Sequence, residues 1–459
     1  MADSSARPSD GGFFYPNGLR RAGRYDAVFY TCYAGTNTFD IRCRFDLKQR
    51  LNRARLQKAA DDALTAYPEF KVRPVICRGG IAYEENFKPV KIVEDENEMR
   101  FFGSDGEKGT NGYLFLFLVG ERHITFSMFH ALTDARGMIS YVITVLWNYA
   151  KYSFPFLRLV SPKMFEAYGI RLNKALFDAM DDVERYDPVA KFRGEGERID
   201  PIDKEKLYRM PEEKFVKEEM TNRVVNMEIS NSAFLQKTLE LHTSFAPLLA
   251  ALAGEAINNT WDIGDRVISI ITTADSRRFF KTKTLGNMAY NVPLPLYKED
   301  FDMPLENICA KLRADMKRQL TKEQARAVMN YTYELGGQVE AMGEVDKVSD
   351  FLCGPEGLKT QNENGTLFLT YPGRVDNNII SKLLLNGVTP GMLSMERAIN
   401  VYAHRDSLVI QVSMKSDDMT LVNALRKTLI RHGFDPRVYD MGVVHQNKMD
   451  YAQIKRVAE

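Results

Sequence analysis

Two short apolar runs in the first third of the chain have the pattern of paired β-strands. They cover residues 113–119 and 123–130 and are separated by the turn-forming triplet GER at 120–122, which predicts a hairpin. Because side chains alternate along a strand, one face of the second run carries Ile124, Phe126, Met128 and His130. This predicts that His130 lies at the end of a strand, on its apolar face, where the next turn begins.

The spacing of hydrophobic residues changes beyond Gly137. Residues 138–149 carry them every three or four positions, which predicts a helix with one broad buried face. The stretch 140–160 is apolar overall, but two basic residues and a proline interrupt it. We therefore predict a buried helix and no transmembrane segment.

The second half of the chain repeats this arrangement. Residues 398–404 and 408–414 predict another hairpin, and the helix after it is expected to start at a cap formed by Asp417 or Asp418 and to end at Gly433. Only the first copy has a histidine where the strand meets the loop, which favours a chemical role for that histidine over a folding role. We expect the two copies to be related substructures packed face to face.

Length and charge distribution divide the chain. A chain of 459 residues is longer than one hydrophobic core usually serves, which predicts two domains. Residues 1–22 predict a flexible N-terminus, 23–180 a first domain, 181–222 a charged crossover linker, and 223–459 a second domain. Within the second domain, residues 304–335 predict an amphipathic helix.

Composition and charge exclude several classes of partner. The chain is 44% hydrophobic and 27% charged, as globular proteins are, and its net charge of +1 gives no basic surface for nucleic acid. The five cysteines are scattered and lack the C-x-x-C spacing of a zinc or redox site. The N-terminus has no apolar core of a secretory signal. We therefore expect a cytoplasmic protein that binds no metal.

His130 is followed four residues later by Asp134, and none of the other five histidines has an aspartate at that spacing. Taken alone the pair is a weak signal, because Asp134, or Thr133 before it, also has the position of a helix N-cap. The context is more specific, because His130 also closes an alternating apolar strand just before a helix.

The stretch FHALTDARGM resembles the H-x-x-x-D-G signature of the chloramphenicol acetyltransferase-like superfamily, which includes alcohol acetyltransferases, plant BAHD acyltransferases and the condensation domains of peptide synthetases. Ala135 stands where the signature has its first glycine, and Gly137 keeps the later one. TTADSRRFF resembles the family's D-x-R element, TLGNMAYNVPLPL its G-N element, and LQKAADDALTAYPEF its first helix. In LTYPGRV, Thr370 and Tyr371 replace the common Ser-Asn pair. These similarities follow the family's order along nearly the whole chain.

The resemblance implies an α/β (α+β) fold of two stacked chloramphenicol acetyltransferase-like domains. It implies mixed sheets flanked by helices, an active-site tunnel at the interface, and a segment near 370–400 that crosses back to the first domain. It also implies that Asp134 pairs with Arg277 of the D-x-R element and fixes the loop, with Arg278 as the competing partner.

Further roles follow from the resemblance. Gly137 and Asp275 would support the site, Thr370 would be a candidate oxyanion donor, and Asn287 would brace the tunnel wall. Lys281 and Lys283 are candidates for contacting carrier phosphates. Each of these residues also has a purely structural interpretation. The Thr370 hydroxyl would bond to the backbone at a strand end, and the two lysines would be solvated side chains of a loop.

Acyl transfer from a thioester to a hydroxyl or an amine requires a base that removes the acceptor's proton and returns it to the departing thiolate. An imidazole with a pKa of about 6.5 suits both steps, and such help is worth roughly 10²- to 10⁴-fold. His130 is the candidate. The sequence has no G-x-S-x-G elbow, P-loop or dinucleotide fingerprint, so we expect direct transfer without an acyl-enzyme and no permanently bound cofactor.

The expected donor is acyl-CoA or the thioester of an acyl carrier protein, and the expected acceptor is a small-molecule alcohol or amine, handled by a monomer. Two alternatives stay open. One is a carrier-protein-dependent condensation enzyme, and the other is a non-catalytic binding module of the same fold.

Overall fold

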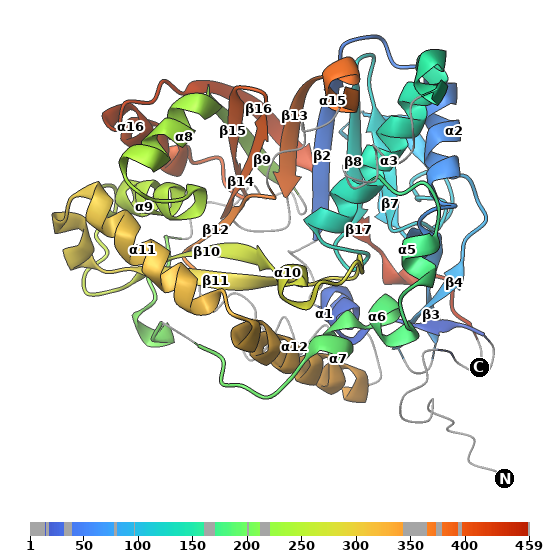
Figure 1. The fold of residues 1–459 in the computed structure, drawn as a ribbon, viewed down its shortest axis with the longest axis horizontal. Helices are drawn as coiled ribbons and strands as arrows, with labels where there is room; N and C mark the ends of the chain where they lie inside the picture. Colours follow the sequence, from blue (N-terminus) through green and yellow to red (C-terminus); the bar gives the residue numbers. More distant parts are fainter. Residues whose placement is uncertain are drawn as a thin grey trace.

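The computed structural model describes residues 14, 18–31, 39–77, 80–95, 97–159, 170–199, 202–211, 221–342, 365–372, 379–392 and 397–457 (Figure 1). Most of the segment 1–22, predicted to be flexible, lies outside these residues.

Two large mixed sheets lie side by side at the centre of the molecule (Figure 1). The five-stranded sheet has the order β13-β2-β8-β7-β5 and the seven-stranded sheet the order β11-β10-β12-β14-β15-β9-β16; a three-stranded sheet, β1-β4-β3, and the pair β17-β6 are smaller. The strands are β1 (Arg20–Arg21), β2 (Asp40–Leu47), β3 (Val72–Cys77), β4 (Gly80–Glu85), β5 (Ile92–Glu94), β6 (Phe101–Phe102), β7 (Phe115–Val119), β8 (His123–Phe129), β9 (Thr221–Ser230), β10 (Ile268–Asp275), β11 (Ala289–Leu296), β12 (Leu367–Thr370), β13 (Leu385–Met392), β14 (Arg397–His404), β15 (Ser407–Met414), β16 (Arg437–His445) and β17 (Lys448–Met449).

Helices pack on both large sheets, with α2 and α3 on the five-stranded sheet and α8, α9, α11 and α16 on the seven-stranded sheet (Figure 1). Their bounds are α1 (Arg24–Thr31), α2 (Arg53–Ala63), α3 (Ala135–Ser153), α5 (Ala175–Asp178), α6 (Asp182–Tyr186), α7 (Pro188–Phe192), α8 (Asn231–Glu240), α9 (Phe245–Asn258), α10 (Arg277–Phe280), α11 (Leu305–Gln319), α12 (Lys322–Met342), α15 (Ile379–Leu384) and α16 (Thr420–Arg431). Among the described helices, none has the length and apolar character needed to cross a lipid bilayer.

Both predicted hairpins are confirmed. β7 pairs antiparallel with β8 and β14 pairs antiparallel with β15. β7 begins at Phe115 rather than at residue 113, because the N–H of Tyr113 donates to the carbonyl of Thr110 and closes a turn there. On β8, Ile124, Phe126 and Met128 are fully buried in the core that α2 and α3 cover, as the alternation predicts.

The two large sheets share one arrangement. In the first, β5 pairs parallel with β7, β7 antiparallel with β8, and β8 antiparallel with β2. In the second, β12 pairs parallel with β14, β14 antiparallel with β15, and β15 antiparallel with β9. In each sheet, a helix follows the hairpin and packs beside a helix from earlier in that half, α3 on α2 and α16 on α9.

One strand from late in the chain belongs to the sheet of the first half. β13 pairs antiparallel with β2 along nearly its whole length and also lies beside β14 of the seven-stranded sheet. The two sheets therefore meet where β2, β13 and β14 run close to one another (Figure 1).

The segment 181–222 differs in part from the solvated linker that its charge predicts. It contains the short helices α6 and α7, which Asp181 and Asp187 cap by accepting hydrogen bonds from backbone N–H groups. Val189 of α7 is buried against Met288 and Met329, so part of this segment packs on the second half. Residues 212–220 lie outside the described residues.

Two other helix predictions need correction. The stretch predicted as one helix over 304–335 forms two helices, α11 and α12, because the chain breaks at Leu320 and Thr321 starts the second by accepting from the N–H of Gln324. The N-cap of α16 is Met419 rather than Asp417 or Asp418, although the Asp418 carboxylate still accepts from the N–H of Thr420 at 2.7 Å.

Candidate functional site

His130 follows directly after β8, which ends at Phe129. Its backbone N–H donates to the carbonyl of Phe39 at 2.9 Å, which fixes the end of the strand. Its ring stacks on Phe29 of α1, with a centroid distance of 4.4 Å and an angle of 11° between the planes. The imidazole is therefore held from the backbone and across one face of the ring.

His130 lines a cavity of about 100 Å³ where the two large sheets meet. The wall comes from both halves of the chain, namely Ile41, Arg42, His130, Asp134, Ala135, Thr273, Ala289, Thr370, Tyr371, Pro372, Gly391, Asn400 and Tyr402. Gly391 of β13 contributes no side chain, and a Cβ there would come within 3.1 Å of the Arg42 Cβ. The cavity exists only because strands from both halves adjoin.

Burial lowers the pKa of the His130 imidazole below its usual value of 6.5. Nearby carbonyl groups, the Asp134 carboxylate and the Asn287 side chain oppose this shift only in part. The ring is therefore neutral at pH 7 and able to accept a proton. Its Nδ1 is buried and has no hydrogen-bond partner among the described residues.

Asp134 is both a helix cap and one half of a buried ion pair. It is the N-cap of α3, and its Oδ1 accepts from the N–H of Arg136 at 3.1 Å and of Gly137 at 3.3 Å. Its Oδ2 accepts from Arg277 Nη2 at 2.8 Å and from the N–H of Met288 at 3.0 Å. Burial alone would raise the pKa of this carboxyl, but the charge and hydrogen bonds of Arg277 and the Met288 N–H hold it below its usual 3.8.

The structure brings Arg277 and Asp275 to the same place. Arg277 is 4% exposed, donates from Nη1 to Asp275 at 3.0 Å, and donates from Nε to the carbonyl of Thr284 at 2.7 Å. The competing candidate, Arg278, is exposed, and its guanidinium lies over the Phe279 ring. Arg277, rather than Arg278, is the partner of Asp134.

Gly137 occupies a position with no room for a side chain. A Cβ there would lie 1.9 Å from Thr133 Oγ1 and 3.1 Å from the carbonyl oxygen of Leu285. Thr133 Oγ1 itself donates to the Leu285 carbonyl. The loop of the second half can therefore approach α3 closely only because residue 137 is glycine. Ala135, in contrast, has its methyl group at the cavity wall.

Asn287 lies behind His130 and is absent from the cavity wall. Its Nδ2 donates to the carbonyls of His130 at 3.0 Å and Ala131 at 3.4 Å, and to Asp26 Oδ1 at 3.4 Å. Because its N–H groups are already engaged, Asn287 is not placed as an oxyanion donor. Its Oδ1 is buried without a hydrogen-bond partner among the described residues.

Thr370 lines the cavity at the end of β12, on the same wall as Asn400 of β14. Its hydroxyl is 2.9 Å from Asn400 Oδ1 and donates to it. Lys281 and Lys283 are exposed on the loop after α10, and neither lines the cavity. In the part of the chain that the structure describes, no three His, Cys, Asp or Glu side chains are grouped as metal ligands would be.

The structure adds residues that the sequence did not single out. Phe29 and Asp26 come from α1, and Arg42 and Asn400 from strands that border the cavity. Arg42 is buried and bonded to Asp40 and to the carbonyl of His445. One signal was available for Asn400, which is an amide within the otherwise apolar run of β14. The others depend on contacts between distant parts of the chain.

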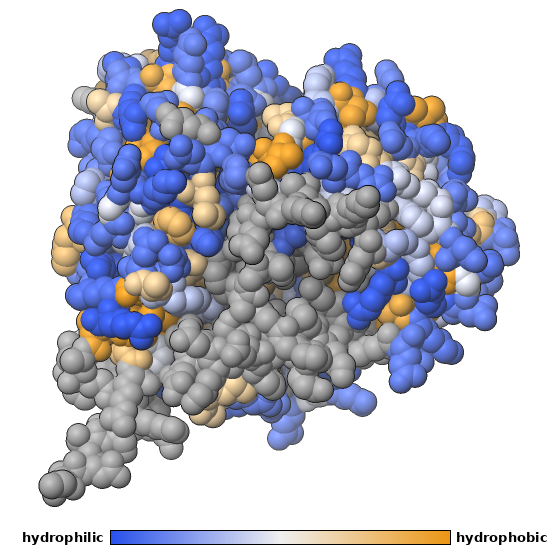
Figure 2. All heavy atoms as spheres, turned by 180° about the vertical axis from the view of Figure 1, so that it is seen from behind, coloured by the Kyte–Doolittle hydropathy of each residue, from blue (hydrophilic) through white to orange (hydrophobic). Residues whose placement is uncertain are grey.

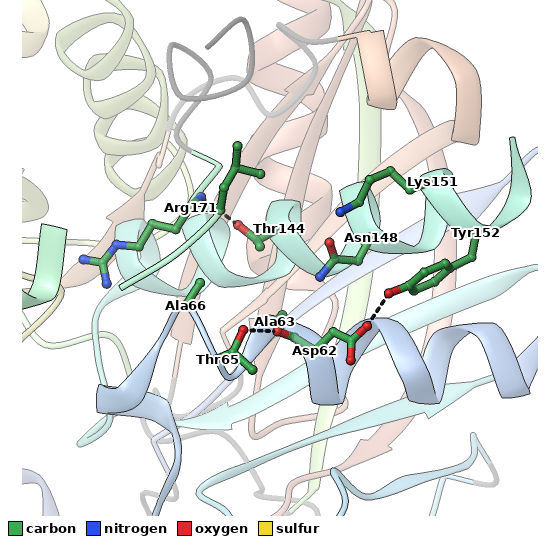
Figure 3. Close-up of a pocket in the computed structure, with 10 residues that line it drawn as sticks. Asp62, Ala63, Thr65, Ala66, Thr144, Asn148, Lys151, Tyr152 and Arg171 are labelled. Carbon is green, nitrogen blue, oxygen red and sulfur yellow. Dashed lines mark hydrogen bonds between the residues drawn. The ribbon is translucent and has the colours of Figure 1, made fainter. Parts of the chain in front are cut away.

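A larger pocket, of about 270 Å³, lies between α2 and α3 on the outside of the first half (Figure 3). Asp62 and Tyr152 are hydrogen-bonded across it, and Arg171 at one end is paired with Glu69. Its wall has no histidine, cysteine or serine. Its one carboxylate, Asp62, is already paired with Lys58 and hydrogen-bonded to Tyr152, so the smaller cavity, which holds His130, is the candidate active site.

No protein-family model matches the chain, and no curated protein is significantly similar to it in sequence. Solved structures are similar over almost the whole chain. A trichothecene 15-O-acetyltransferase from Fusarium sporotrichioides is 11% identical, with 90% of this chain and 94% of that chain covered and a TM-score of 0.55. TRI101 of F. graminearum complexed with coenzyme A and T-2 mycotoxin is 9% identical, with 92% and 99% covered and a TM-score of 0.57.

The starter condensation domain of rhizomide synthetase in complex with C8-CoA is 10% identical, with 90% of this chain and 93% of that chain covered and a TM-score of 0.56. The similarity therefore confirms the predicted fold class. The chain shares with these structures a fold of mixed sheets flanked by helices, as the resemblance to the chloramphenicol acetyltransferase-like superfamily predicts.

Proposed function

We propose that the protein is an acyltransferase that moves an acyl group from a thioester to a hydroxyl or an amine of a small molecule, with His130 as the general base. The observation that carries this proposal is a neutral imidazole on the wall of a cavity that both halves build. The fold supports it, because similar structures include an acetyltransferase and complexes with coenzyme A.

In the proposed step, the imidazole takes the proton of the acceptor O–H or N–H as that oxygen or nitrogen bonds to the thioester carbonyl carbon. The carbonyl π electrons move onto oxygen and give a tetrahedral oxyanion. When they return, the C–S bond breaks, and the imidazolium delivers its proton to the departing thiolate sulfur. Atoms and charge balance without an acyl-enzyme, so a single base is enough.

Asp134 acts on this step only through the loop that carries the base. Its carboxylate is filled by Arg277 and three backbone N–H groups, which leaves no oxygen directed at the substrate. The pair ties the start of α3 to the first residue of α10, and Arg277 in turn holds the loop after α10 through the carbonyls of Thr284 and Gly286. We propose a positioning role for Asp134 and Arg277, with Asp275 and Gly137 supporting that contact.

Thr370 is the proposed donor to the oxyanion. The Thr370 hydroxyl donates to Asn400 Oδ1. A 180° rotation of the Asn400 amide group would exchange the positions of its oxygen and its nitrogen. With Asn400 rotated, its Nδ2 donates to Thr370 and frees the threonine proton for the cavity. A preorganised donor of this kind is typically worth about 10²- to 10³-fold in kcat.

Acyl-CoA is the proposed donor. The two alternative functions, a condensation enzyme and a non-catalytic binding module, predict different rates of thioester consumption. A condensation enzyme would consume an acylated carrier protein faster than acyl-CoA. A non-catalytic module would consume neither. The deciding assay measures free thiol release from acetyl-CoA, octanoyl-CoA and an octanoylated carrier protein, each with a mixture of small alcohols and amines.

His130→Ala is expected to abolish thiol release while its melting temperature stays within a few degrees of the parent, because His130 lies on the cavity wall and its Nδ1 has no hydrogen-bond partner among the described residues. Lys427→Ala is the matched control, since that side chain is exposed on α16 and outside the cavity. Thiol release by His130→Ala at the parental rate would disprove the proposed function.

A further inference from the structure

Helix α1 contributes two contacts to the back of His130. Phe29 stacks on the imidazole ring, and Asp26, one turn earlier on the same helix, accepts a hydrogen bond from Asn287 Nδ2 at 3.4 Å. The same Nδ2 donates to the carbonyl of His130 at 3.0 Å. The amide of Asn287 is therefore held between the backbone of the proposed base and a carboxyl group on α1.

Two buried atoms at this place have no partner among the described residues, His130 Nδ1 and Asn287 Oδ1. One is able to donate and the other only to accept. The backbone of His130, the Asp134 carboxylate, the Asn287 side chain, which is 2% exposed, and the backbone of Thr133 all favour the protonated ring of His130 and oppose the effect of burial on its pKa. Rotating the amide by 180° would turn Oδ1 toward three acceptor oxygens, those of the His130 and Ala131 carbonyls and of Asp26. The orientation that leaves Oδ1 available to the imidazole is thus the favourable one.

We propose that Asp26 is a positioning residue for His130, and that its carboxylate fixes the Asn287 amide so that Oδ1 accepts a hydrogen bond from Nδ1–H of the imidazole. This keeps the Nε2 nitrogen unprotonated and available to a substrate in the cavity. The catalytic role of the Asp26–Asn287–His130 contacts rests on the proposed function. Their effect on the tautomer of His130 is independent of it.

The charge state of Asp26 responds to its surroundings near neutral pH. Burial raises the pKa of its carboxyl to about 7; Arg20 of β1 and the Asn287 amide lower it, and Asp187 at the start of α7 raises it further. Tyr30 of α1 and Tyr83 of β4 also face it, and both hydroxyls stay neutral because burial raises their pKa values well above the usual range. From α12, Glu340 is already paired with Arg21 and Arg24.

An ionised Asp26 accepts from Asn287 more strongly than a neutral carboxyl does. The hold on the amide therefore strengthens as the pH rises through about 7. The share of neutral His130 with its proton on Nδ1 is expected to rise over the same interval.

Long-range proton–nitrogen NMR correlations on protein labelled with ¹⁵N-histidine test this, because they distinguish the two tautomers in the whole chain. His130 is identified by the signals lost in His130→Ala. In the parent, the Nδ1–H share is expected to increase between about pH 6 and pH 8. In Asp26→Asn it is expected to stay flat, and in Asn287→Ala the two tautomers are expected to mix at every pH.

Asp187→Asn is the matched control, because it removes a neighbouring carboxylate that contacts neither Asn287 nor His130. It is expected to keep the parental rise, displaced to lower pH. The inference is overturned if Asp26→Asn shows the same rise as the parent, or if the parent shows none. Asp26→Asn is nearly isosteric, so a folded sample is available even if Asn287→Ala does not fold.

Thiol release adds a second measurement. Asp26→Asn is expected to lower kcat three- to tenfold at about pH 8, with little change in the KM for the thioester, and to remove one titration from the pH profile. Parental activity in His130→Ala would refute the proposed function and leave the NMR result to decide the tautomer. An inactive His130→Ala, together with unchanged NMR and pH behaviour in Asp26→Asn, would refute only the role of Asp26.

Discussion

Asp134 shows how one carboxylate has two structural roles. An N-cap of this kind stabilises a helix by about 1 kcal/mol, and loss of one partner from a buried ion pair costs roughly 3 to 5 kcal/mol. Both contacts exist here, one on each oxygen. The loss of unfolding free energy when Asp134 is replaced therefore shows which of the two contacts contributes more to stability.

Asp134→Asn keeps a side-chain oxygen for the cap but leaves Arg277 with only Asp275 as a charged partner. We expect it to lower the free energy of unfolding by about 3 kcal/mol, measured by urea denaturation. Asp134→Asn combined with Arg277→Met should recover part of that loss, because no buried charge remains unpaired. A loss below about 1 kcal/mol in the single variant would mean that the cap is the contact that matters.

Gly137→Ala is expected to destabilise the protein by at least 2 kcal/mol, although alanine is the better helix former. The added Cβ would overlap Thr133 Oγ1, and the Leu285 carbonyl closes the other side. Gly337→Ala in α12 is the control, because its Cβ meets only the end of Arg24 at 3.5 Å and should stabilise by up to about 1 kcal/mol. Equal effects at the two glycines would contradict the close approach at α3.

The pH dependence of stability should have opposite signs at two groups. His130 has a lowered pKa when folded, so its contribution is present above about pH 6.5 and is lost as the pH falls. Asp26 has a raised pKa, so its contribution is present below the unfolded value near 4 and is lost as the pH rises through about 7. Asp26→Asn should therefore gain about 1 to 2 kcal/mol over the parent at pH 8 and little at pH 4. Chemical denaturation at both pH values measures this, and an equal difference at both would contradict it.

At the scale of elements, local patterns predicted the hairpin and the helix that flank His130 and Asp134. β7, β8 and α3 follow from hydrophobic periods of two and of three to four, because each period is set by the geometry of one element. The role of α1 could not be predicted, since Phe29 and Asp26 meet His130 and Asn287 only after distant parts of the chain pack.

β13 joins the two halves, and its inward side chains should matter to both. Val388 is 2% exposed in the core of the first half, so Val388→Asp buries a carboxylate without a partner. We expect a loss of at least 3 kcal/mol and of thiol release together, because the strand also carries Gly391 of the cavity wall. Asn386→Asp on the same strand is exposed and should change neither. Stability measured by denaturation and activity measured on the same samples decide the matter.

At the scale of the molecule, each half has a sheet, a hairpin and a covering helix of the same arrangement, but the cavity belongs to neither half alone. The order of short motifs along the chain was enough to predict the fold class. It was not enough to predict the cavity wall, because the sequence did not show that β2, which carries Arg42, and β14, which carries Asn400 and Tyr402, meet at β13. On one face of the molecule, hydrophilic side chains cover most of the part that the structure describes (Figure 2).

Ligand binding at the junction of the halves should stabilise the whole molecule, because a ligand that contacts both lobes binds only when they are packed together. Coenzyme A at about 100 times its Kd is expected to add about 2.7 kcal/mol to the free energy of unfolding. The gain should persist in His130→Ala, since that variant loses only one side chain and keeps the rest of the cavity wall, and it should be smaller in Val388→Asp. Thermal unfolding at increasing coenzyme A concentrations measures it, with adenosine 3′,5′-bisphosphate, which lacks the pantetheine arm, as the control. A rise in melting temperature with an acylated carrier protein but none with coenzyme A would instead favour the condensation enzyme. Both donors present a pantetheine arm, so the difference would come from binding to the carrier protein itself.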